Sequence, residues 1–204
     1  MTSTTEQPTV VRRLGSPAAL ALADLVSIFD DLQTVLRCCE RLVTELAVPP
    51  NRSDDLAIEA IWTTAALSYA RCFATGSRGM GLTEDDVRGV KLQGEVLEWH
   101  KVLRELRKHY SSPTENPRER FEVGVVQDQN GGPGGIAVTS TVQPRLDDIT
   151  VRQTGALAYE LSQLVNQRIT EHQERLFGTA GSMTAAELKK LPQIDVATPD
   201  QPET

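Results

Sequence analysis

The feature that most constrains the fold is a regular apolar pattern that begins after Gly15 and continues to residue 46. Apolar side chains recur there at alternating steps of three and four residues: Leu25, Ile28, Leu32, Val35, Cys39, Leu42 and Leu46. This spacing gathers them on one side of a helix and leaves charged residues on the other. Ser16 suits the N-cap and Pro17 the first helical position, while Val48-Pro49-Pro50 ends the pattern. The sequence therefore predicts a long amphipathic helix over residues 16–46, which either joins a bundle or forms the seam of a dimer.

Capping residues and apolar spacing predict further helices along the chain. Ser53 and Thr83 are candidate N-caps, and Asp147-Asp148 opens the last long helix. Gly76 and Gly178 are well suited to end the helices that precede them. Besides the first helix, we expect helices at residues 53–75, 95–110, 147–177 and 185–191, and a short one that starts at residue 84.

The apolar period changes from helical to extended between residues 121 and 143. Two β-rich runs, 121–126 and 136–142, flank a glycine-rich connection that contains Asn130-Gly131. Such runs around such a connection are typical of a β-hairpin, in which Val123 and Val125 share one face. We therefore expect one inserted hairpin at about residues 121–143.

Together these elements predict a mainly α fold, an antiparallel bundle of four to five helices with the inserted hairpin. Only 4% of the residues are aromatic, so the core must consist of Leu, Val, Ile and Ala, which suits packing of helix on helix. A chain of 204 residues favours one domain, which we place at residues 14–178. Residues 1–13 are expected to form a flexible arm, and residues 179–204 a disordered acidic tail that contains prolines.

Charge and cysteine content restrict the partners and the compartment. A net charge of −7 argues against a protein that coats nucleic acid with its whole surface. No apolar run approaches the roughly 18 residues that span a bilayer, and the first 13 residues lack the apolar centre of a secretory signal. The three cysteines, two of them adjacent, favour free thiols in a reducing compartment. We therefore expect a cytoplasmic protein without a membrane segment, and no spacing of His and Cys predicts a metal site or a cofactor.

Basic residues concentrate in the helix predicted at 95–110. On an unbroken helix His100, Arg104 and Arg107 lie within about 60° of one another, with Lys101 and Lys108 beside them. These residues predict a basic face on an acidic protein. The face could contact RNA through its phosphates, or it could be a solvated helix end whose charges complement the helix dipole.

His109 extends this interpretation to catalysis only if the helix ends early. On an unbroken helix it projects about 140° from Arg104 and falls near Glu105, with which it could form a surface ion pair. The catalytic interpretation needs Pro113 and the two serines before it to end the helix early, which would let His109 swing toward Arg104. A histidine can act as general base near neutral pH, and a guanidinium can bind a phosphate and stabilise developing charge. Arg104 and His109 are therefore the candidate catalytic pair for metal-independent RNA cleavage, and His100, Lys101, Arg107 and Lys108 are the candidate RNA-binding residues.

The segment Arg104-Glu105-Leu106-Arg107-Lys108-His109 resembles the signature of HEPN domains, an arginine followed after four to six residues by a histidine. The resemblance covers about residues 54–177 and also involves Tyr69 to Phe73, Gly76 to Arg78, His100 and the hairpin from Phe121. HEPN domains are small helical bundles, often dimeric, and many are RNases of toxin–antitoxin and phage-defence systems.

The resemblance implies an RNA-binding protein or a metal-independent endoribonuclease that forms a homodimer. An alignment without a gap instead places Tyr110 at the histidine position. The base would then be lost, because tyrosine, with a pKa of about 10, is a poor base at neutral pH. The alternative function is a non-catalytic protein that dimerises or docks a partner protein through the helix at 16–46.

Overall fold

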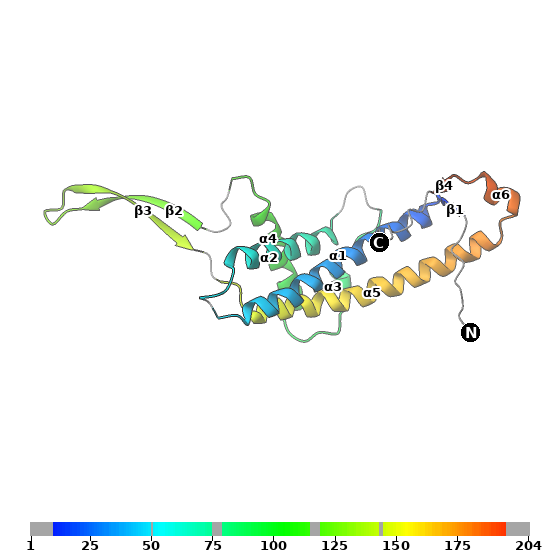
Figure 1. Ribbon diagram of the computed structural model, residues 1–204, viewed down its shortest axis with the longest axis horizontal. Coiled ribbons are helices and arrows are strands. Elements are labelled where there is room, and N and C mark those ends of the chain that lie inside the picture. Colours follow the sequence, from blue (N-terminus) through cyan, green and yellow to red (C-terminus); the bar gives the residue numbers. More distant parts are fainter. Residues whose placement is uncertain (1–9, 50, 75–78, 115–118, 143–144, 195–204) are drawn as a thin grey trace, which may run out of the picture.

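Two long helices, α1 (Pro17–Leu46) and α5 (Asp148–Gly181), run antiparallel and side by side along the molecule (Figure 1). Each begins at a side-chain cap, because Ser16 and Asp147 each accept a hydrogen bond from a backbone amide of the first helical turn. Such caps satisfy amides that would otherwise have no partner within the helix. The predicted starts of both helices are confirmed.

The structure is a computed structural model that describes residues 10–49, 51–74, 79–114, 119–142 and 145–194. In these ranges the chain forms six helices and two small two-stranded sheets, so the predicted mainly α fold is confirmed. No helix within them is both long enough and apolar enough to cross a membrane. Nor do three or more His, Cys, Asp or Glu side chains of these ranges gather as ligands of a metal ion would.

The shorter helices α2 (Asp55–Arg71), α3 (Glu84–Arg88) and α4 (Val96–Tyr110) lie against one half of the long pair. α2 packs on α1, α4 packs on α2, and α3 packs on α4. The core that they share has as its largest fully buried members Tyr69, Leu25, Ile28, Leu32, Leu42, Leu103, Leu157, Leu161 and His100. The apolar stripe of α1 is thus covered within one chain. The described part of this helix therefore has no exposed apolar stripe left for the predicted dimer or partner contact.

The predicted hairpin is confirmed as β2 (Glu119–Gln127) and β3 (Pro133–Val142), which pair antiparallel. It projects from one end of the helical body (Figure 1). Gly131 in the connection has φ +83°, a conformation that glycine adopts without steric cost. Both strands extend beyond the predicted runs.

Two helix ends differ from the sequence prediction. α2 ends at Arg71 and not near residue 75, because the chain turns back and the carbonyl of Cys72 accepts a hydrogen bond from the amide of Leu82 at 2.9 Å. α5 continues through Gly178 to Gly181. A glycine inside a helix costs only about 1 kcal/mol, which does not suffice to end a helix that the rest of its sequence favours.

The two ends of the described chain meet beside the far end of the long helices. β1 (Val11–Arg12) pairs antiparallel with β4 (Gln193–Ile194), and α6 (Ala185–Lys190) follows α5. The amide of Arg13 also donates to the carbonyl of Pro192 at 2.7 Å. Residues 10–13 and 179–194, predicted to belong to a flexible arm and a disordered tail, therefore have a defined structure. The rest of both predicted segments, residues 1–9 and 195–204, lies outside the described residues.

Candidate anion-binding pocket between α2 and α4

A pocket of about 260 Å³ opens between the end of α2 and the second half of α4. Four cationic side chains line it, together with two alanines and a phenylalanine: Arg71, Arg104, Arg107, Lys108, Ala70, Ala74 and Phe73. None of these described lining residues is acidic. The pocket is therefore a local concentration of positive charge in a chain whose net charge is −7.

Hydrogen bonds to Asp31 and Ser68 fix the orientation of the Arg71 side chain. Its Nε and Nη2 both donate to Oδ1 of Asp31, at 2.9 and 2.5 Å, and Nη2 also donates to the hydroxyl of Ser68 at 2.9 Å. The hydrogen bond to Asp31 raises the pKa of Arg71 above its ordinary value. Because the Asp31 carboxylate offsets part of the charge, Arg71 shapes the pocket more than it adds to the positive potential.

Arg104 and Arg107 supply the unpaired charge of the pocket. Neither forms an ion pair or hydrogen bond with another residue of the described part of the chain, whereas Lys108 donates to Glu105 at 2.6 Å. Residues three apart on a helix are neighbours on its surface, so both guanidinium groups reach the same opening. A guanidinium presents a planar fork of donors that matches the oxygens of a phosphate or carboxylate. The arrangement can therefore bind an oxyanion.

His100 lies behind the pocket wall and is completely buried. Its Nδ1 is 2.8 Å from the hydroxyl of Tyr69, and its ring centre is 4.4 Å from that of Phe73, which lines the pocket. Burial lowers the pKa of His100 below its ordinary value, and the positive charge of Arg104 lowers it further. The imidazole is thus neutral at neutral pH and joins α4 to α2, while its Nε2 is buried without a hydrogen-bond partner in the described structure.

The structure does not bring the candidate catalytic pair together within one chain. The predicted helix at 95–110 is confirmed, and the early end that the catalytic interpretation needs is not found, because α4 stays helical through Tyr110 and Ser111 is its C-cap. A separation of five residues on this helix leaves His109 about 140° from Arg104. Arg104 lines the pocket, whereas His109 is not among its lining residues and its ring lies 5.9 Å from that of Tyr110.

Tyr110, the other candidate for the motif position, is no better suited as a base. Its side chain is half-buried against the core. This burial raises the pKa of Tyr110 above its ordinary value, although a hydrogen bond with Trp62 opposes the shift. Tyr110 would therefore take part in proton transfer at neutral pH even less readily than an exposed tyrosine.

Of the four predicted RNA-binding residues, two line the pocket and two do not. Arg107 and Lys108 line it beside Arg104. His100 must be corrected, because it is buried against Tyr69 and cannot contact RNA from the surface. Lys101 is exposed but lies outside the pocket and donates to Glu98 at 2.7 Å.

Sequence reasoning missed Arg71 and Phe73 as residues of the pocket. At the end of α2, Arg71 has the usual position of a cation that complements a helix dipole. Phe73 follows the helix as one more apolar residue. Only the packing of α2 on α4 gives them a common role, and no local spacing indicates it.

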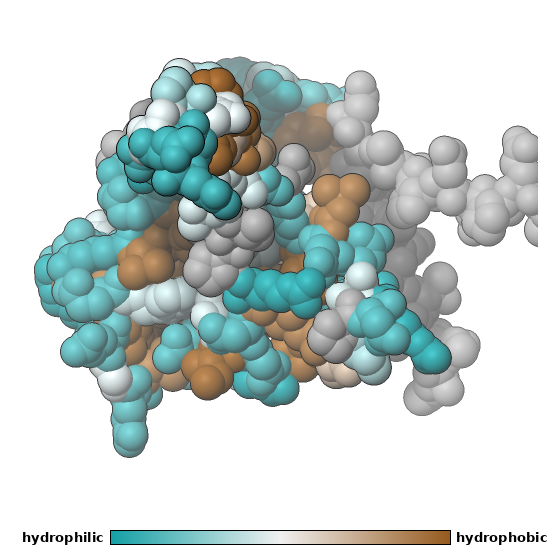
Figure 2. Space-filling model, turned by 90° about the vertical axis from the view of Figure 1, so that its left-hand side faces the viewer, coloured by the Kyte–Doolittle hydropathy of each residue, from teal (hydrophilic) through white to brown (hydrophobic). Residues whose placement is uncertain are grey.

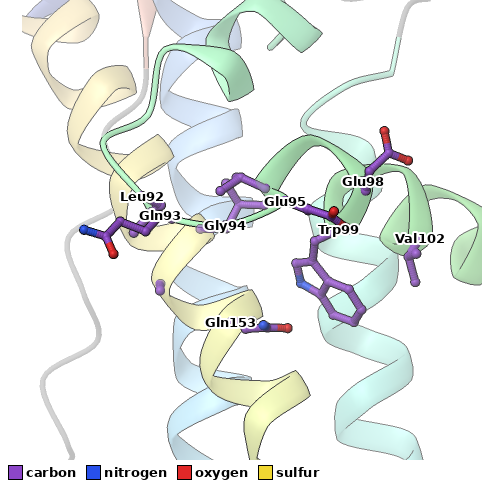
Figure 3. A pocket seen from close by; sticks show the side chains of 11 residues that line it. Leu92, Gln93, Gly94, Glu95, Glu98, Trp99, Val102 and Gln153 are labelled. Atoms are coloured by element: carbon purple, nitrogen blue, oxygen red, sulfur yellow. The ribbon is translucent and has the colours of Figure 1, made fainter.

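A second pocket, of about 360 Å³, lies at the other end of α4, where that helix faces α5 (Figure 3). The indole nitrogen of Trp99 donates there to the hydroxyl of Thr154 at 3.2 Å and so anchors α4 to α5. Glu95 and Glu98 are the charged residues in its described lining. Since these carboxylates repel phosphate, the pocket between α2 and α4 is the better candidate for an anion.

No protein-family model, no curated protein and no solved structure matches this chain.

Proposed function

We propose that the chain is a HEPN-like RNA-binding protein that holds a phosphate of single-stranded RNA in the pocket between α2 and α4. The observation that carries the proposal is the pair of unpaired guanidinium groups, Arg104 and Arg107, in a described lining without a carboxylate. The resemblance of residues 104–109 to the HEPN signature supports RNA as the source of that phosphate.

The size of the pocket supports a phosphate of the RNA backbone as its ligand. Sites that enclose a whole small molecule usually measure about 300 Å³ or more, and this pocket, of about 260 Å³, falls below that range. Phe73, the aromatic residue in its lining, is only 4% exposed and offers little surface for base stacking. A phosphodiester that projects from a longer strand therefore fits better than an enclosed nucleotide.

The geometry supports binding and not cleavage. Cleavage by the predicted mechanism needs an imidazole beside the bound phosphate, yet His109 lies on another side of α4 and His100 is buried. The toxin or defence role that the HEPN resemblance implies depends on cleavage, which RNA binding alone does not provide. We expect unstructured RNA to remain intact with the pure protein in the absence of metal.

Fluorescence anisotropy with a labelled single-stranded RNA tests the proposal. We expect Arg104→Ala and Arg107→Ala each to weaken binding by about tenfold, because each removes a charge-assisted contact of roughly 1.5 kcal/mol. Lys101→Ala is the matched control, since it removes a cation from the same helix outside the pocket and should leave Kd unchanged.

Salt dependence separates a phosphate contact from indirect effects on the fold. For single strands each phosphate contact contributes about 0.7 to the slope of log K against log salt concentration. The slope should therefore fall by roughly that amount in Arg104→Ala and stay constant in Lys101→Ala. Equal weakening by both variants, or RNA cleavage that His109→Ala abolishes, would contradict the proposal.

A further inference from the structure

The β-hairpin carries two faces of opposite character. In an antiparallel pair, residues directly opposite each other point to the same side of the sheet. Val123 lies opposite Val138, Val125 opposite Ile136, and Phe121 opposite Ser140. The other side carries mainly polar residues along the middle of the strands: Arg120, Glu122, Thr139 and Thr141.

The apolar face is exposed in the single chain. Its five large side chains are between 57% and 72% exposed: Phe121, Val123, Val125, Ile136 and Val138. No described helix packs extensively on the hairpin, which stands clear of the helical body (Figure 1). Figure 2 shows the molecule from the end that carries the hairpin, and hydrophobic residues are visible on this face of the molecule. A two-stranded sheet of this kind is at best marginally stable in water without a partner surface.

We infer that a second copy of this chain covers this apolar face, so that two hairpins pack face to face about a two-fold axis. Five side chains so exposed present on the order of 500 Å² of apolar surface, near the upper end of what a monomer usually leaves open. Two copies would bury about 1,000 Å² together, which is the lower limit for a specific interface. Packed sheets lie about 10 Å apart, so the side chains of both copies can interlock.

The charge distribution favours a second copy over a lipid surface. Between Phe121 and Val125 and along the residues opposite them, the apolar face carries no charged residue, so two copies meet without repulsion there. The described hairpin residues 119–142 include one cation, Arg120, and three carboxylates, Glu119, Glu122 and Asp128. A hairpin with net negative charge is repelled by anionic membrane surfaces. The patch is also the same on both copies, as a two-fold interface requires.

Sedimentation velocity of the full chain over a hundredfold range of concentration tests this inference. We expect a reversible monomer–dimer equilibrium. Val123→Glu and, separately, Val138→Glu should shift it to monomer and raise the dimer Kd at least tenfold, because each buries a carboxylate in the interface. Thr141→Glu, which places the same charge on the polar face opposite Arg120, is the matched control and should leave the Kd unchanged.

Two further measurements distinguish loss of the hairpin interface from unfolding and from a contact through α1. Helical circular dichroism should be equal in all variants, and so should the thermal midpoints at concentrations where every protein is monomeric, which shows that loss of the dimer does not reflect unfolding. Leu20→Glu alters an exposed residue of α1 and should not affect the dimer, unless the interface involves that helix. A chain that is monomeric at every concentration overturns the inference, as does a dimer that survives Val123→Glu and Val138→Glu. Binding of a monomer to phosphatidylcholine–phosphatidylserine vesicles that Val123→Glu abolishes would assign the face to lipid instead.

Discussion

His100 is buried between α2 and α4 although its helical spacing places it near Arg104. The hydroxyl of Tyr69, 31 residues earlier in the chain, lies 2.8 Å from Nδ1 of the imidazole. Tyr69→Phe would leave Nδ1 without a partner in a ring whose Nε2 already has none. We expect this change to lower the free energy of unfolding by about 1–3 kcal/mol, the usual cost of an unsatisfied buried polar group. Urea denaturation measures it, with Tyr159→Phe as control, since that tyrosine is exposed and its change should cost less than about 0.5 kcal/mol.

The depressed pKa of His100 predicts a dependence of stability on pH. The folded protein holds His100 neutral at pH values where the unfolded chain, with a pKa near 6.5, already binds a proton. The unfolded state therefore binds more protons as the pH falls below about 6.5, and stability decreases, with a limit of about 1.4 kcal/mol per pH unit. Urea denaturation at pH 7.5 and 5.5 should show a larger loss of stability for the wild type than for His100→Asn. Equal losses in both proteins would mean that the buried imidazole is not responsible.

The helical position of Arg104, Arg107 and Lys108 could be predicted from spacing alone, since all three belong to one helix. The burial of His100 and the role of Arg71 could not, because both depend on contacts between α2 and α4. The sequence between these helices contains no spacing that determines which of their faces meet. The catalytic interpretation fails for a local reason: α4 continues through Tyr110, so His109 stays on a different side of the helix from Arg104.

At the scale of elements, α5 packs closely against α1 at Gly155. A Cβ atom at this position would lie 3.4 Å from the Cβ of Cys39, whereas one at Gly178 of the same helix would meet nothing within 4 Å. We expect Gly155→Leu to force the two helices apart and to destabilise the chain by about 1–3 kcal/mol. Gly178→Leu should be neutral or slightly stabilising, because a better helix former replaces glycine at an open site. Thermal unfolding of both variants checks this; an equal loss at Gly178 would show that the close approach is not the cause.

Helix starts were easier to predict than helix ends, for a physical reason. Ser16, Thr83 and Asp147 act on amides within their own first turn, so a few adjacent residues contain the whole interaction. The end of α2 instead depends on a hydrogen bond between Cys72 and Leu82, which forms only after the chain has turned back. Gly178 likewise suits a helix end, yet α5 continues past it to Gly181, so a suitable residue alone does not end a helix.

The molecule as a whole separates into a helical body with one shared core and a hairpin outside it. Every buried apolar residue of the described core belongs to the helices or to the segments between them, and none to β2 or β3. The basic pocket also lies within the body, between α2 and α4. Binding of an anion and association through the hairpin are therefore properties of different parts of the chain, and a change in one should leave the other intact.

Removal of the hairpin tests this separation. Glu119 and Val142 are register partners, so their Cα atoms lie about 5 Å apart and a short glycine–serine linker can replace residues 119–142. Because the core loses no side chain, the free energy of unfolding should change by less than about 0.5 kcal/mol when both proteins are compared at concentrations where they are monomeric. The shortened chain should bind RNA as tightly as the wild type and sediment as a monomer at every concentration. A cooperative loss of stability would instead place the hairpin among the elements on which the helical core depends, and its apolar face would then have a partner within the chain.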